Sequence, residues 1–151
     1  MKLAEALILR ADCQKRFAQV QSRLVGNAKI QEGDEPAEKP QELIRELEGV
    51  ADELVDLIKR INKTNSATVL ATGKTISYVL AERDVLAMRR AAYNNLALNA
   101  AVAQGRLTRS EIKYVSTIKV AEIQKRADEL AKQYRELDSR IQELNWQTEL
   151  I

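Results

Sequence analysis

The C-terminal part of the chain carries an unbroken ladder of apolar residues. Their spacing alternates between three and four residues, which places every member on one stripe of a single helix. Such a stripe must be covered by other helices, so the ladder restricts this part of the chain to helix-on-helix packing. Its members are Val120, Ile123, Ala127, Leu130, Tyr134, Leu137, Ile141 and Leu144.

Similar stripes predict three more long helices. The first runs from about residue 2 to 25 and stops at Gly26. The polar stretch 31–39 predicts an exposed loop, and Pro40 suits the first turn of a second helix. A third helix is expected over 75–104. The inner stripes are Leu3, Ala6, Cys13, Phe17, Val20 and Leu24 in the first helix, and Leu43, Leu47, Val50, Leu54, Leu57 and Ile61 in the second.

Four long helices of matched length, joined by shorter connections, favour an antiparallel four-helix bundle in a single domain, residues 1–151. Only residues 112–119 depart from a helical pattern, because β-branched and polar residues alternate there with the period of a strand. A small two-stranded β element with residues 28–31, in the connections at one end of the bundle, would explain this alternation. An irregular connector is the commoner outcome for such a segment.

The chain has no histidine and a single cysteine, Cys13. A disulfide within the chain, a Cys/His zinc site and a histidine acid–base pair all need residues that are absent. We therefore predict no cofactor, no metal and no enzymatic activity, with Cys13 as a buried thiol. Residues 1–10 show no export signal and the sequence has no apolar run of about 18 residues, so the expected location is the cytoplasm.

The third helix is apolar on two sides when its residues are placed 100° apart. A helix in a monomeric bundle buries one broad stripe, so the second side predicts a partner, and we expect a homo-oligomer. Neutral surface alanines are the alternative reading. The predicted oligomer face consists of Ala81, Val85, Met88, Ala92 and Leu96.

Three polar residues of this helix, Arg83, Arg90 and Asn94, fall within its inner stripe. A buried arginine needs a carboxylate partner, and the second helix offers Asp52 and Asp56, with Glu53 between them. The favoured interpretation is an ion-pair layer that fixes helix register. An anion or ligand pocket inside the bundle is the alternative.

Charge is segregated along the chain. Residues 31–56 hold ten acidic and two basic residues, whereas residues 57–119 hold eleven basic and three acidic ones. Pairing between helices explains the two opposite charges most simply. A nucleic-acid-binding module in the basic 83–119 region is the second hypothesis, and it would use Arg89, Arg106, Arg109, Lys113 and Lys119.

Several strings resemble a family of small bacterial proteins of uncharacterised function that often carry the label septicolysin or septicolysin-like. They are Asn-Ala-Lys-Ile-Gln-Glu-Gly at 27–33, Glu-Pro at 35–36, Arg-Ile-Asn-Lys-Thr-Asn at 60–65, Arg-Asp-Val-Leu at 83–86, Arg-Ser-Glu-Ile-Lys at 109–113 and Ile-Gln-Glu-Leu-Asn-Trp at 141–146. The label implies a pore-forming toxin. The predicted helices are too densely charged to enter a bilayer, so we expect no membrane as a partner.

The sequence thus favours a non-enzymatic, cytoplasmic helical bundle that self-associates through its third helix. The two alternatives are the nucleic-acid-binding module and a ligand-binding or enzymatic bundle with a pocket around Arg83 and Arg90.

Overall fold

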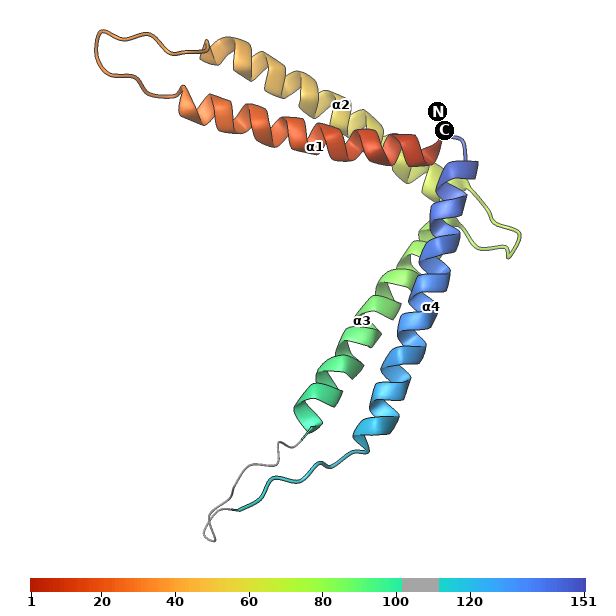
Figure 1. Ribbon diagram of the computed structural model, residues 1–151. Coiled ribbons are helices and arrows are strands. Elements are labelled where there is room, and N and C mark those ends of the chain that lie inside the picture. The colour runs from red at the N-terminus through yellow and green to blue at the C-terminus, as the bar shows by residue number, and fades with distance from the viewer. Residues whose placement is uncertain (102–111) are drawn as a thin grey trace. The chain divides into compact units, whose positions relative to one another are not determined.

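The computed structural model describes residues 1–101 and 112–151, and over these residues it is all-α (Figure 1). The elements in chain order are α1 (Leu3–Gly26), α2 (Pro40–Ala67), α3 (Ile76–Ala100) and α4 (Val120–Gln147). The helices contain 24, 28, 25 and 28 residues respectively. This confirms the predicted fold class, and α2 begins at Pro40 as expected. Residues 102–104 of the predicted third helix lie outside the described residues.

The chain divides into two compact units. The first contains Met1–Thr75 together with Glu143–Ile151, and the second contains Ile76–Gln142. A single domain over residues 1–151 therefore stays a prediction, and each unit is described by itself below.

In the first unit, α1 and α2 lie side by side and run antiparallel (Figure 1). The two inner stripes predicted from the sequence are buried or half-buried throughout. Arg10 lies on the α1 stripe between Ala6 and Cys13, at the one step where the apolar series is interrupted. Its Nε is buried and has no hydrogen-bond partner among the described atoms.

The loop between these helices is held by a single arginine. Arg23 Nε donates to Glu38 Oε2 at 3.0 Å, and Nη1 donates to Glu46 Oε1 at 3.3 Å. Asn27 completes the arrangement, since its Nδ2 donates to the Arg23 carbonyl and its Oδ1 accepts from the Glu38 backbone N–H. The hydrogen bonds from Arg23 lower the pKa of Glu38, against the opposing effect of desolvation. The loop from 28 to 37 is thus closed at its base.

Replacing Glu38 by glutamine should remove a pH-dependent part of the stability. Because the pKa of Glu38 in the folded chain is below its ordinary value of 4.5, the carboxylate stabilises the fold fully above that value. This contribution disappears as the pH falls through the lowered pKa. Urea unfolding should show Glu38→Gln to be less stable than the wild type at pH 7, with the gap closing in acid. Glu35→Gln, at an exposed position of the same loop, is the matched control. A gap that is constant with pH would contradict this account.

The two ends of the chain meet in the first unit. Leu3 N–H donates to the Thr148 carbonyl and Leu150 N–H donates to the Met1 carbonyl, both at 2.9 Å, so Lys2 and Glu149 form an isolated antiparallel bridge. Glu149 also pairs with the Lys2 ammonium group and the N-terminal amine. These hydrogen bonds from Lys2 and the N-terminus lower the pKa of Glu149.

Thr64 anchors the last residue from the side of α2. Its side chain is completely buried. The hydroxyl donates to the Arg60 carbonyl at 2.9 Å and accepts from the Ile151 backbone N–H at 3.0 Å. Arg60 Nε donates to the Ile151 carbonyl at 3.4 Å. The string at 60–65 that the sequence analysis singled out therefore includes the two residues that hold Ile151.

Thr64→Val keeps the shape of this side chain but removes both hydrogen bonds. The Ile151 N–H then loses a buried acceptor, which should cost about 1–2 kcal/mol of unfolding free energy. Urea denaturation measures the loss, and amide hydrogen exchange should show faster exchange at Ile151. Thr72→Val, at an exposed threonine in the turn after α2, should change neither quantity. Equal stability of Thr64→Val and the wild type would mean that this contact contributes nothing.

In the second unit, α3 and α4 run antiparallel, with Arg83 near the start of α3 paired to Asp138 near the end of α4 (Figure 1). Every member of the apolar ladder of α4 is buried or half-buried, and Leu130 is completely inaccessible to solvent. The outward side of α4 carries charged and polar residues, including Lys125, Lys132 and Glu136. The ladder is therefore the packing face of α4, as predicted.

Of the two outcomes left open for residues 112–119, the structure shows the irregular connector and not the two-stranded β element. Residues 112–119 form an irregular segment, and residues 28–31 are irregular as well. The backbone bridges recorded over the described residues are isolated ones, Lys2 with Glu149 and Val69 with Thr75. Alternation of side chains is a property of any extended backbone, so the pattern did not require a paired strand.

Candidate functional site

The outward face of α3 is the most unusual surface of the second unit. All five residues of the predicted oligomer face, Ala81, Val85, Met88, Ala92 and Leu96, are exposed. Val85 is 52% exposed and Met88 is 70% exposed. The opposite side of the same helix is buried at Ile76, Val79 and Ala97. Burial of α3 is therefore confined to parts of this opposite side, and the five residues of the predicted oligomer face lie in water.

A shallow groove of about 500 Å³ runs along this face at the side of α4. Residues of α3 line most of it, and Leu137 of α4 closes one side. The charged side chains at its rim are Glu82 and Arg89. Arg89 is exposed and has no ion-pair partner in the described part of the chain. The groove combines apolar walls with one acidic and one basic group. The complete lining is Ala81, Glu82, Val85, Leu86, Arg89 and Leu137.

Arg83 lies in the inner stripe of α3 and is half-buried. Its Nη2 donates to Asp84 Oδ1 at 2.9 Å, and its Nη1 donates to Asp138 Oδ1 at 3.2 Å. Burial opposes the charged guanidinium, but the hydrogen bonds to Asp84 and Asp138 outweigh it and raise the pKa of Arg83. The partner across the helix pair is therefore an acid of α4. Sequence analysis missed Asp138, although it follows ladder residue Leu137 and could have been found from the antiparallel register.

The predicted partners on α2 belong to the other unit. Asp52 and Asp56 are both exposed, and Asp56 pairs with Arg60 on its own helix at 4.0 Å. They lie in the first unit, whereas Arg83 lies in the second. Their pairing with Arg83 stays a prediction, and within its own unit Arg83 pairs with Asp138 of α4.

Arg90 is exposed, so the prediction that it is buried is also wrong. Its long side chain leaves the inner stripe for water and needs no carboxylate there. It lines a hollow of about 320 Å³ with half-buried Asn94 and with Ala87, Ala91 and Tyr134. Arg83 is not among the residues that line this hollow. The structure brings Arg90 and Asn94 together, and it places Arg83 in a separate ion pair.

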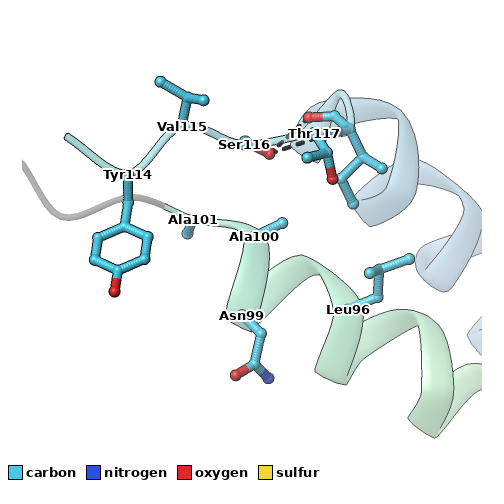
Figure 2. A pocket seen from close by; sticks show the side chains of 9 residues that line it. Leu96, Asn99, Ala100, Ala101, Tyr114, Val115, Ser116 and Thr117 are labelled. Carbon is cyan, nitrogen blue, oxygen red and sulfur yellow. Dashed lines mark hydrogen bonds between the residues drawn. The ribbon is translucent and has the colours of Figure 1, made fainter. Parts of the chain in front are cut away.

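A second apolar hollow, of about 530 Å³, lies at the C-terminal end of α3. Figure 2 shows the irregular segment passing this end, with the side chains of Tyr114 and Val115 on opposite sides of extended backbone. Ser116 Oγ donates to the Ile118 carbonyl at 2.8 Å and shapes the approach to α4. The hollow was not expected from the sequence, because the alternating pattern says nothing of what the segment packs against. Its lining residues are Leu96, Asn99, Ala100, Ala101, Tyr114, Val115, Ser116, Thr117 and Ile118.

The basic residues of the nucleic-acid hypothesis are only partly described. Arg106 and Arg109 lie outside the described residues. Arg89, Lys113 and Lys119 are exposed. Lys119 Nζ lies 3.6 Å from Glu122 Oε1, in the first turn of α4. The described members therefore include one that is already paired with an acid.

Neither a metal centre nor a reactive thiol is visible in the described ranges. They contain no group of three metal-ligating side chains. Cys13 is buried, and burial, with Glu53 nearby, raises the pKa of its thiol. A raised pKa keeps the thiol protonated and poorly nucleophilic. None of the helices, searched over the same residues, is long and apolar enough to cross a membrane.

Comparison with known proteins places the chain in a family. Residues 10–150 match the model of a family of unknown function, DUF6847. The chain belongs to this family. A solved structure described as a functionally unknown conserved protein from Corynebacterium diphtheriae is similar to this DUF6847 chain, with 48% identity and a TM-score of 0.93. The match covers 100% of this chain and 99% of that one. No curated protein matches the chain.

These comparisons correct one part of the resemblance noted in the sequence. A family of uncharacterised small proteins is confirmed, but the septicolysin label finds no support in the DUF6847 match or in the solved structure.

Arg83 and Arg90, one heptad apart on the same stripe of α3, provide a matched pair of substitutions. Arg83→Ala removes three charge-assisted hydrogen bonds, two to Asp84 and one to Asp138, and should cost about 1–2 kcal/mol of unfolding free energy. This cost is below the roughly 3–5 kcal/mol expected when a fully buried ion pair is broken, because the Arg83 ion pair is partly exposed to water. Arg90→Ala, at an exposed position, should cost under about 0.5 kcal/mol. Chemical denaturation of both variants measures the difference, and equal losses would show that the Asp138 contact is not what distinguishes the two sites.

Proposed function

We propose that this protein is a non-enzymatic, cytoplasmic assembly protein that self-associates through the outward face of α3. The observation that carries the proposal is the exposure of Val85, Met88 and Leu96 in line with two alanines, on a helix whose other side is buried at Ile76, Val79 and Ala97. The cytoplasmic location rests on the sequence alone. The non-enzymatic part rests on the residue inventory, which lacks histidine.

The outward faces of the two helices in the second unit differ in polarity. The outward face of α4 is charged, as expected of a helix side that stays in water. The outward face of α3 instead presents a continuous apolar stripe, and water-exposed stripes of this kind mark interaction sites. Covering such a stripe is favourable by roughly 25 cal/mol for each Å² of apolar surface removed from water.

The two alternative functions lack a comparable observation. The hollow beside Arg90 and Asn94 is lined by one cation and the Tyr134 hydroxyl, and no carboxylate is among its lining residues to complete an acid–base pair. The described basic residues Arg89, Lys113 and Lys119 are spread over different segments, and they do not form a stripe along one helix. Self-association is therefore the function that the geometry supports best.

Light scattering on the purified chain tests the proposal. The wild type should have the mass of two or more chains at micromolar concentration. Val85→Glu with Met88→Glu should return the mass to one chain, because two carboxylates cannot be desolvated in an apolar contact. Helical circular dichroism should persist, since neither side chain packs inside the unit.

The matched control adds the same two charges elsewhere. Gln133→Glu with Gln142→Glu places them at exposed positions of α4. This variant should keep the wild-type mass. A wild type that has the mass of one chain at micromolar concentration would contradict the proposal.

A further inference from the structure

The exposed stripe of α3 has the spacing of a coiled-coil seam. From Ala81 the steps to Val85, Met88 and Ala92 are four, three and four residues. This is the same alternation that the buried ladder of α4 shows. The larger side chains occupy the middle of the seam and alanines occupy its two ends, so a facing helix can approach closely along its whole length.

The groove borders this seam on the side of α4. Val85 belongs to both, and the groove continues from it through Leu86 to Leu137 of α4. The apolar surface of the seam is therefore widened on this side. Its charged rim consists of Glu82 and Arg89.

One acid and one base beside the seam are ordered in a way that selects a direction. Glu82 comes before the centre of the seam and Arg89 comes after it, and both border the groove. Two parallel copies would place Glu82 level with Glu82 and Arg89 level with Arg89. Two antiparallel copies place Glu82 of each copy beside Arg89 of the other, which is the favourable arrangement.

We infer that the partner of this face is the same face of a second copy, packed antiparallel about a twofold axis between Val85 and Met88. The inference rests on the proposed self-association and adds its direction and register. Met88 of each copy then contacts Val85 of the other, and Ala81 faces Ala92. Glu82 then lies beside Arg89 of the partner, and twofold symmetry forms this pair twice.

Charge reversal tests this register. Glu82→Arg alone places two arginines beside each other at both symmetric pairs, and Arg89→Glu alone places two glutamates there. Each variant should dimerise at least tenfold more weakly than the wild type. A 1:1 mixture should recover the wild-type affinity, because every pair in the heterodimer is again one acid and one base. Sedimentation equilibrium measures all three, and recovery in the mixture shows that both variants are folded.

Disulfide trapping tests the direction independently. In a Cys13→Ser background, Ala81→Cys and Ala92→Cys should form a disulfide-linked dimer when the two variants are mixed, and neither should do so alone. A disulfide needs Cα atoms within roughly 7 Å, so only facing positions react. Linked dimers of each variant alone would show parallel packing and overturn the inference.

The outcomes separate this inference from the proposed function. A wild type that dimerises while both charge-reversed variants keep full affinity would overturn the register and leave self-association standing. A wild type that stays monomeric in the same sedimentation experiment would overturn both.

Discussion

Interlocking of apolar side chains at alternating steps of three and four residues is the interaction on which this structure depends. Each of α1, α2 and α4 carries such a stripe, and the stripes are buried or half-buried along their length. Aromatic residues make up only 4% of the chain, so small and branched aliphatic side chains must fill these seams. Because the helices exceed 20 residues, each seam repeats the same contact many times, and helix pairing follows from the periodicity.

Three arginines lie on the apolar stripes, and each is accommodated in a different way. Arg10, Arg83 and Arg90 all occupy steps of an inner stripe, and each reaches water to some extent. Arg83 pairs with Asp138, and the Arg90 side chain extends into solvent. Arg10 is half-buried, and its buried Nε has no hydrogen-bond partner among the described atoms. Long arginine side chains thus let a seam tolerate a charge at its edge without the full cost of burying one.

Periodicity allowed the four helices, the start of α2 at Pro40 and the packing face of α4 to be predicted, because each depends on local spacing. The two apolar sides of α3 could be read from the sequence for the same reason. The partner that Arg83 has within its own unit could not, since it depends on which helix lies opposite. The sequence left the segment 112–119 open between a strand and an irregular connector, because extended backbone alternates its side chains whether or not another strand pairs with it (Figure 2).

The central claim is that the outward stripe of α3 is covered by a second copy of the chain. Methionine oxidation tests it with an internal control, because the chain has two methionines: Met88, 70% exposed on the stripe, and Met1, 46% exposed in the first unit. The rate of oxidation by dilute peroxide should be measured for both as protein concentration rises. The account predicts that Met88 becomes several-fold slower to oxidise while Met1 does not change. A Met88 rate that is independent of concentration would contradict it.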